Sequence, residues 1–397
     1  MKRLLLPALL LTILTACTAA PAGTLPAAAP TPTPASTPAP TAAPAPADAL
    51  TPEEKIGQLF IIRPDALDLT LSQETINDAK ADGVTMLTDA MRETLQAYPV
   101  GGICQFGKNI TDPEQLAQFN ADLQAASRTP LFIAVDEEGG AVARLANHPA
   151  FDLPQYESAA AVGASGDPAD ACAMGQTIGA YLKEYGFNMD FAPDADVNTN
   201  PDNPIIGTRA FSSDAATAAE MAAAAADGLR TSGILPTLKH FPGHGDTAED
   251  SHTALAVTYK TLDELQACEL LPFAADTGLH AVMVGHIAAP NVTGDLTPAS
   301  LSGTMITGYL RGDLGFTGLV ITDSMAMHGV TDAYSSGDAA IAALEAGVDI
   351  ILMPEVLSEA FDAVVAAVEN GTISEARLNE SVYRVLQYKQ LYGIFNL

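Results

Sequence analysis

The densest group of residues that could do chemistry lies at positions 239–252, where the sequence reads KHFPGHGDTAEDSH. These fourteen positions hold three histidines, three carboxylates and two glycines, and they follow a candidate β-strand directly. Metal binding and acid/base catalysis both fit this composition. The possible metal ligands are His240, His244, Asp246, Asp250 and His252. Their spacing is not that of a helical zinc site, and Lys239 would repel a cation beside His240, so we expect no metal.

Acid/base catalysis needs only two of these residues. Asp250 and His252 are two positions apart, and a carboxylate in a turn can accept a hydrogen bond from such an imidazole, fix its tautomer and raise its pKa. Gly243 and Gly245 allow backbone angles that are closed to other residues, which favours a shaped loop. We therefore expect Asp250 and His252 to act together as a catalytic dyad.

Other polar side chains also stand where apolar runs end. They are Asp136, Glu137 and Glu138 with Arg144 a turn later, then Lys239 with His240, then His286, and finally Asp323. Parallel strands bring such groups to one rim, and burying several charges together is costly unless they pair or bind something. We expect Glu137 and Glu138 to be ion partners for arginines, and His286 to line the pocket as a packing or substrate contact.

The elements that must position these groups alternate between strands and helices from residue 50 onward. The strand candidates are 58–62, 101–106, 131–136, 188–192, 236–240, 281–286, 319–323 and 349–353. Most are continuous apolar runs, as parallel strands covered on both faces require. Eight such strands with intervening helices predict an α/β fold with a single (β/α)8 TIM-type barrel. An open doubly wound sheet is the alternative, but no glycine-rich fingerprint follows the first strand.

Several helix ends are also marked in the sequence. Asp167-Pro168 predicts a helix start, and Gly186 the end of that helix. Thr261 with Glu264 forms a capping box before a helix at 265–273. Other predicted helices run from Ser358 to Asn370-Gly371 and over residues 375–392.

The first 49 residues predict export and anchoring rather than fold. Residues 1–17 have a basic start, an apolar stretch of about eleven residues and the ending Leu14-Thr15-Ala16-Cys17, which resembles a bacterial lipobox. Residues 18–49 are almost entirely Ala, Pro and Thr, which is typical of a disordered tether. We expect lipidation at Cys17, an extracytoplasmic location at the cell membrane, and a catalytic domain at 50–397.

Charge and cysteine content exclude some classes of partner. The chain has 18 basic and 48 acidic residues, a net charge of −30, which argues against nucleic-acid binding. Cys104, Cys172 and Cys268 lack metal-type spacing, and we interpret them as small buried hydrophobic residues, with one disulfide possible in an oxidising compartment. We expect a monomer without a cofactor.

The motifs together resemble the family-3 glycoside hydrolases, in the branch of the β-N-acetylhexosaminidases. The resemblance covers about residues 50–392 and rests on VDEEGGAVARL, IGTRAFSSD, KHFPGHGDTAEDSH and VITDSMAM, in that order. It implies a carbohydrate substrate, with Asp136, Arg144, Arg209, Lys239 and His240 binding the sugar. It also implies that Asp323 is the nucleophile and that Asp250 and His252 supply the general acid/base. A carboxylate opposite a proton donor is what retaining glycoside hydrolysis needs, although the usual donor is a carboxylic acid.

Two features depart from the family pattern. Many relatives carry a second α/β domain, whereas this chain stops after the predicted barrel, and the stretch 63–99 is long for a first crossover. A β-glucosidase of the same family usually lacks the DSH loop. A glycoside phosphorylase is closer, because a histidine donor repels phosphate less than a carboxylate does. A sugar-binding lipoprotein is the non-enzyme alternative. The sequence leaves open whether a substrate would derive from peptidoglycan or chitin.

Overall fold

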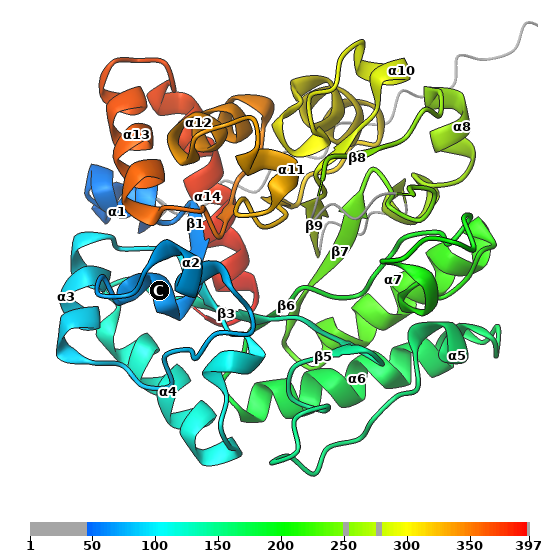
Figure 1. Cartoon of the computed structure of the whole chain (residues 1–397), viewed down its shortest axis with the longest axis horizontal. Coiled ribbons are helices and arrows are strands. Elements are labelled where there is room, and N and C mark those ends of the chain that lie inside the picture. Colours follow the sequence, from blue (N-terminus) through cyan, green and yellow to red (C-terminus); the bar gives the residue numbers. More distant parts are fainter. Residues whose placement is uncertain (1–45, 249–253, 275–279, 395–397) are drawn as a thin grey trace, which may run out of the picture. The chain divides into compact units, whose positions relative to one another are not determined.

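The computed structural model describes residues 46–248, 254–274 and 280–394, and its centre is a barrel of parallel strands (Figure 1). The eight strands are β1 (Phe60–Ile62), β2 (Gly102–Cys104), β3 (Phe132–Val135), β6 (Met189–Asp190), β7 (Leu235–Phe241), β9 (Ala281–Val284), β11 (Leu319–Thr322) and β12 (Ile351–Leu352). They pair in the order β11-β9-β7-β6-β3-β2-β1-β12. A parallel bridge between Ile321 and Ile350 connects the two ends of this order, which closes the barrel. The predicted fold class is confirmed, and each strand candidate overlaps one barrel strand.

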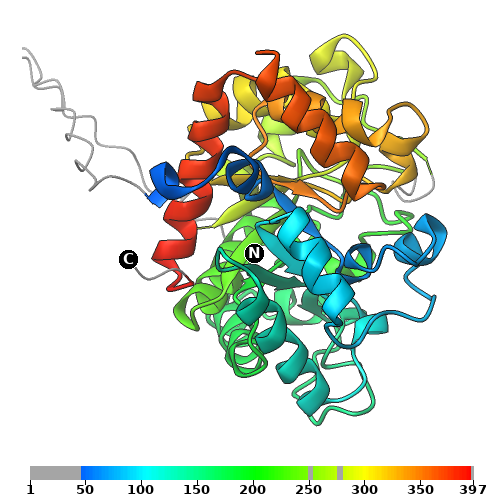
Figure 2. The same ribbon diagram turned by 90° about the vertical axis from the view of Figure 1, so that its left-hand side faces the viewer.

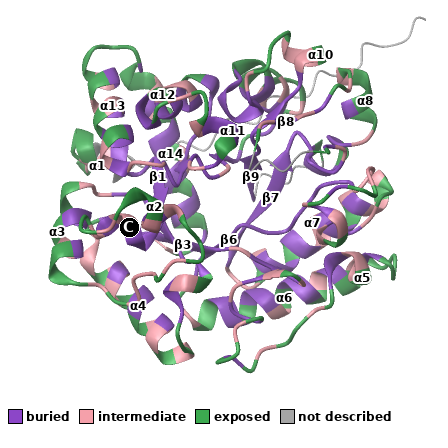
Figure 3. Ribbon diagram, in the orientation of Figure 1, coloured by how far each residue is buried: buried purple, intermediate pink, exposed green. Residues whose placement is uncertain are grey.

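The strands form because they bury both faces. In β3, Phe132 and Ala134 pack in one hydrophobic cluster, whereas Ile133 and Val135 pack in another. Since successive side chains of a strand point to opposite faces, the two clusters lie on the two sides of the barrel wall. Figure 3 shows the strands as almost wholly buried and the helices as exposed on one side only. This explains the continuous apolar runs of the sequence.

Helices follow most strands and surround the barrel (Figure 1). The α-helices are α1 (Pro52–Gly57), α2 (Gln73–Asn77), α3 (Asp89–Ala97), α4 (Pro113–Ala126), α5 (Ala159–Gly163), α6 (Pro168–Glu184), α7 (Ala215–Thr231), α8 (Leu262–Ala267), α9 (Leu271–Ala274), α10 (Pro290–Thr293), α11 (His328–Thr331), α12 (Ser336–Ala346), α13 (Leu357–Glu369) and α14 (Glu375–Leu391). In Figure 2, α14 lies beside α1, which it contacts.

Shorter strands and helices lie in the loops that connect the barrel strands and the α-helices. The remaining strands are β4 (Glu137–Gly139), β5 (Val142–Ala143), β8 (Ala256–Val257) and β10 (Ile287–Ala288). The 3-10 helices are η1 (Pro46–Ala49), η2 (Pro64–Leu67), η3 (Gly107–Asn109), η4 (Gly207–Arg209) and η5 (Ala299–Leu301), and η6 (Thr304–Asp313) is a π-helix. Within the described ranges, no helix is both long and apolar enough to cross a membrane.

The helix ends were predicted with mixed success. Asp167 caps α6 through the N–H of Ala169, and Thr261 with Glu264 forms the expected capping box. The single helix predicted at 265–273 is wrong, because the chain leaves helical angles at Cys268 and resumes as α9. The start at Ser358 is also misplaced: α13 begins at Leu357, with Val356 as a cap that makes no side-chain hydrogen bond.

The three cysteines of the described chain are free thiols. Cys104 is fully buried in the barrel, as predicted for a small hydrophobic residue. Cys172 and Cys268 are only partly buried, so that interpretation fails for them. Cys17 and the predicted tether lie outside the described residues.

The long first crossover, residues 63–99, folds over one side of the rim at the strands' carboxyl ends. It contains η2, α2 and α3. Its backbone is tied to the segment after β2, because Lys108 Nζ donates to the carbonyl oxygens of Thr75, Ile76 and Asp78 at 2.9–3.0 Å. This crossover therefore forms part of the wall around the site described next.

Candidate active site

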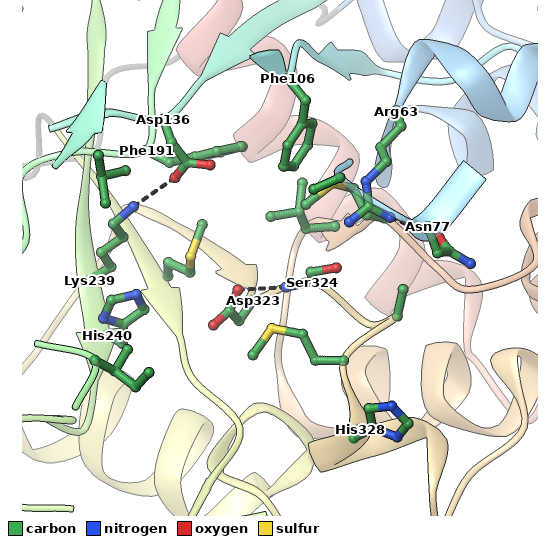
Figure 4. Close-up of a pocket in the computed structure, with 18 of the residues that line it drawn as sticks. Arg63, Asn77, Phe106, Asp136, Phe191, Lys239, His240, Asp323, Ser324 and His328 are labelled. Atoms are coloured by element: carbon green, nitrogen blue, oxygen red, sulfur yellow. Dashed lines mark hydrogen bonds and ion pairs between the residues drawn. The ribbon is translucent and has the colours of Figure 1, made fainter. Parts of the chain in front are cut away.

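A cavity of about 680 Å³ opens at the carboxyl ends of the barrel strands (Figure 4). Its volume falls in the range of ordinary ligand pockets. Six of the predicted site residues line it: Asp136, Arg144, Arg209, Lys239, His240 and Asp323. The predicted dyad of Asp250 and His252 lies outside the described residues.

Asp323 stands directly after β11, where the strand positions it. Its backbone N–H donates to the carbonyl oxygen of Val284 at 2.9 Å, which continues the pairing with β9. One carboxylate oxygen, Oδ1, accepts a hydrogen bond from the N–H of Ser324 at 2.7 Å. The side chain is half-buried and points into the cavity, so its carboxylate is held at a fixed place in the cavity lining.

Opposite charges pair closely on one side of Asp323. Lys239 Nζ lies 2.7 Å from Asp136 Oδ1 and 2.6 Å from Glu138 Oε1. Arg209 donates to both oxygens of Glu138, each at 2.8 Å, and Arg144 lies 3.8 Å from Asp136. Burial alone would lower the pKa of Lys239, but the two carboxylates raise it above its ordinary value. Lys239 therefore stays charged and can donate hydrogen bonds to hydroxyl groups.

Asp196 and Asp194 form a second charged group, which contacts His240. The Nδ1 atom of His240 is 2.8 Å from Asp196 Oδ2, a hydrogen bond that orients the imidazole ring. Burial would lower the pKa of His240, but the Asp196 carboxylate raises it, and His240 in turn holds the pKa of the buried Asp196 below its usual range. Burial and the charge of Asp196 raise the pKa of Asp194 to about 7. The Asp196 carboxylate thus favours the imidazolium form of His240, against the opposing effects of burial and of the Arg209 charge.

The atoms of Asp194, Asp196 and His240 lie within 4.8 Å of one another, close enough to hold a metal ion. However, Arg209 Nε is 3.5 Å from Asp194 Oδ2, and Arg209 Nη2 is 3.5 Å from His240 Nε2. A permanent cation thus already neutralises this cluster, and a metal ligand histidine would have to lose its proton. The residues fit a hydrogen-bonded ion network better than a metal site.

The base of the loop at 239–252 is held by the segment that follows β6. Asn203 Nδ2 donates to the carbonyl oxygens of His244 and Thr247, at 2.8 and 3.0 Å. The N–H of His244 donates to Asp196 Oδ1 at 2.6 Å. A Cβ at Gly245 would lie 1.9 Å from the carbonyl oxygen of Val197, so only glycine permits this approach. His244 Nδ1 bonds the Thr247 hydroxyl, and Asp246 lies 3.2 Å from Lys260, so both residues help to shape the loop.

Two neighbouring residues take structural roles. His286 is fully buried and is not among the described residues that line the cavity, because its ring nitrogens bond Ser300 Oγ and the carbonyl oxygen of Ser324. This favours the packing alternative. Glu138 pairs with Arg209 as expected. Among the described residues, Glu137 forms no ion pair with an arginine side chain, and its carboxylate accepts from the backbone N–H groups of Leu145 and Ala146 and from the Tyr181 hydroxyl.

Sequence reasoning overlooked the acids after β6. Asp194 and Asp196 follow that strand, and Asp190 ends it. The same rule about polar residues at strand ends would have found them. It also overlooked Arg63, which directly follows β1, and Phe106, which follows β2; both line the cavity.

Comparison with known proteins agrees with this geometry. Residues 51–388 match the family described as the glycosyl hydrolase family 3 N terminal domain. The chain is 33% identical to "Beta-hexosaminidase A" of Pseudoalteromonas piscicida, over 80% of this chain and 58% of that protein. It is 36% identical to "Beta-hexosaminidase" of Stenotrophomonas maltophilia, over 70% of this chain and 84% of that protein.

A solved structure is similar as well. A glycoside hydrolase family 3 β-N-acetylglucosaminidase from Paenibacillus sp. superposes with a TM-score of 0.77 and 38% identity, over 87% of this chain and 63% of that one. The chain thus spans less than two thirds of the Pseudoalteromonas and Paenibacillus proteins. The barrel, the charged pocket at its rim and these matches show that the chain belongs to glycosyl hydrolase family 3, through the N-terminal domain of that family.

Proposed function

We propose that this protein is a retaining glycoside hydrolase that releases terminal β-linked N-acetylhexosamine, from peptidoglycan fragments or chitin-type oligosaccharides. One observation carries the proposal: Asp323 projects into the cavity beside a group of paired charges that suits sugar hydroxyls. The names of the similar proteins support the N-acetylhexosamine specificity.

In this mechanism, Asp136, Lys239 and His240 bind the hydroxyl groups of the terminal sugar, together with Arg144 and Arg209. The ion pairs fix these side chains before substrate arrives, so little ordering is needed on binding. Asp323 Oδ2 attacks the anomeric carbon, and the bond to the leaving group breaks as the covalent bond to the enzyme forms. Oδ1 keeps its hydrogen bond to Ser324, which fixes the attacking geometry.

His252 gives its proton to the oxygen of the leaving group, and Asp250 stabilises the imidazolium. In the second step, His252 accepts a proton from water, which attacks the anomeric carbon and releases Asp323. The bonds of Asn203 to His244 and Thr247 support this assignment, because they fix the base of the loop that carries the dyad.

Replacement of the nucleophile tests the function. Asp323→Ala should lower turnover of an aryl β-N-acetylglucosaminide by several orders of magnitude, because the variant has no carboxylate at this position to form the covalent intermediate. A slow fluorinated substrate should leave a covalent label on Asp323 in the wild type. A label on Asp136 or Glu138 would show that the assignment is mistaken.

We also propose that the protein is held at the outer face of the cell membrane through acylated Cys17, with residues 18–49 as a tether. Stable retention needs more than one acyl chain, which a lipoprotein cysteine supplies. Labelled palmitate should enter the wild-type protein and not Cys17→Ala. A chain that begins near residue 50 should keep full activity on small substrates, because every proposed site residue follows it. Unlabelled wild-type protein in the cytoplasm would disprove the anchor.

A further inference from the structure

Arg63 differs from the other cations of the cavity in its partners. Lys239 and Arg209 form ion pairs shorter than 3 Å, and Arg144 lies 3.8 Å from Asp136. Arg63 is buried to 91% and lines the cavity, yet within the described residues it makes no ion pair. The one hydrogen bond of its side chain there runs from Nη1 to Asn77 Oδ1, a neutral acceptor, at 2.8 Å.

The guanidinium of Arg63 is nevertheless held firmly. Asn77 Nδ2 donates to the carbonyl oxygen of Glu355 at 3.2 Å, so the amide that binds Arg63 is itself fixed. The ring of Phe106 supports the guanidinium, with 4.9 Å between the ring centroid and Cζ. The guanidinium of Arg144 lies 5.8 Å from the same centroid. Two cationic groups therefore gather around one aromatic ring.

Such an arrangement is costly in the empty protein. A guanidinium has five N–H donors, and it does not escape burial by losing a proton. Asp65 and Asp136 act on the charge of Arg63, but neither forms an ion pair with it. A buried charge with no counter-ion at ion-pair distance is destabilising. An oxyanion in the cavity would supply a close counter-charge and accept the unused donors, in the forked geometry that arginine favours.

The position of Arg63 in the cavity indicates which part of a bound ligand it would contact. In the view of Figure 4, the Asp136–Lys239 pair lies to the left of Asp323 and the Arg63–Asn77 pair to its right. If the first pair binds the terminal sugar and Asp323 attacks its anomeric carbon, Arg63 faces whatever occupies the leaving-group side. The crossover at 63–99 supplies both Arg63 and Asn77, so this long segment would contribute to ligand binding.

We propose that Arg63, with Asn77 and Phe106, forms an oxyanion-binding subsite on the leaving-group side of the cavity. Its ligand is either the carboxylate of an acidic leaving-group sugar or free phosphate. The side assigned to the subsite rests on the proposed function, whereas the binding of an oxyanion at Arg63 does not.

Kinetics on a matched pair of disaccharides test the subsite. The pair is N-acetylglucosaminyl-β-1,4-N-acetylmuramic acid and its methyl ester, which differ only in the charge of one carboxyl group. A charged hydrogen-bonded pair predicts a kcat/KM about ten- to hundredfold higher for the acid. Arg63→Met should abolish that preference, so that the acid and the ester are cleaved with equal kcat/KM. Arg128→Met, at an exposed arginine, should retain the preference.

Phosphate provides the second arm. If free phosphate is the ligand, it should change turnover of the ester in the wild type and in Arg128→Met but not in Arg63→Met. A wild type that shows neither an acid preference nor a phosphate effect overturns the subsite. Persistence of either effect in Arg63→Met does so as well.

Calorimetry separates this proposal from the proposed function, because it needs no turnover. N-acetylmuramic acid or inorganic phosphate should bind the wild type at least tenfold more tightly than Arg63→Met. If neither substrate is cleaved but this difference is found, the hydrolase proposal fails and the oxyanion site stands. If Arg63→Met does not fold, Asn77→Ala should weaken the same binding, and wild-type protein that binds neither anion overturns the site.

Discussion

Lys389 predicts an unusual dependence of stability on pH. This residue of α14 is fully buried, and its Nζ donates to Gln58 Oε1 at 2.7 Å and to the carbonyl oxygen of Gly101 at 2.8 Å. Both acceptors are neutral, and burial lowers the pKa of Lys389 to about 7 from 10.5. Gln58 and Gly101 precede β1 and β2, so Lys389 lies at the end of the barrel opposite the candidate active site.

The sign of the effect follows from proton binding. Between pH 7 and 10.5 the unfolded chain keeps a proton on Lys389 that the folded chain has lost, so the free energy of unfolding should rise with pH across this window. Each pKa unit corresponds to about 1.4 kcal/mol, which makes the whole rise on the order of 5 kcal/mol. Below pH 7 both states are protonated, and this contribution no longer changes.

Lys389→Met removes the titrating group while keeping an apolar chain of similar length. Above pH 10.5 the variant should be about 1–3 kcal/mol less stable than the wild type, because Gln58 Oε1 loses its donor. Below pH 7 it should be more stable by about 2–4 kcal/mol, because no charge is buried. The difference between the two proteins cancels groups that titrate alike in both.

Urea unfolding at intervals from pH 6 to pH 11 measures this difference. Lys183→Met, at an exposed lysine of α6, provides the control and should differ from the wild type by the same amount at every pH. A difference for Lys389→Met that stays constant with pH, or that changes in the opposite direction, would refute the reasoning.

Three further predictions concern the site. His252→Ala should lower turnover about 10²–10⁴-fold on a disaccharide and far less on a dinitrophenyl glycoside, because only the poorer leaving group needs protonation; equal losses would argue against the acid/base role. Asp196→Asn removes the carboxylate that raises the pKa of His240, so His240 should lose its proton at a lower pH. The KM for the sugar substrate should then begin to rise at a lower pH than in the wild type, and an unchanged pH profile of KM would contradict the pairing of Asp196 with His240. Asn203→Ala should lower kcat about tenfold to a hundredfold on the disaccharide, because it frees the base of the loop, whereas full activity would show that the loop needs no such support.

The barrel could be predicted because its signal is local. A parallel strand buried on both faces favours a continuous apolar run, and residues 132–135 and 319–321 are such runs. Helix caps such as Asp167 are equally local, since the side chain bonds an N–H two positions away. The break between α8 and α9 has no such signal. It occurs at Cys268, a residue without a turn preference, where Leu270 bonds back to Leu265.

The site residues were visible in the sequence, whereas their pairing was not. Asp136 and Asp323 directly follow a strand and Lys239 lies near the end of β7, and the same rule of polar residues at strand ends, applied to β6, would have marked Asp194. Which carboxylate meets which cation depends on side-chain reach across the rim. Glu138 illustrates this, because it follows β3 and accepts from a lysine of β7 and from Arg209.

That pairing also explains why the charges of this rim should not be treated one at a time. Glu138 binds both Arg209 and Lys239, Lys239 also binds Asp136, and Asp136 lies near Arg144. Loss of Glu138 would remove one carboxylate partner from each of two cations, and would leave Lys239 with Asp136 and Arg209 with Asp194. The effects of substitutions along this chain should therefore be strongly non-additive. Arg63 forms no ion pair with these residues. It shares the Phe106 ring with Arg144 and feels the charge of Asp136 from beyond ion-pair distance, so a substitution of Arg63 should leave the ion pairs of Lys239 and Arg209 in place.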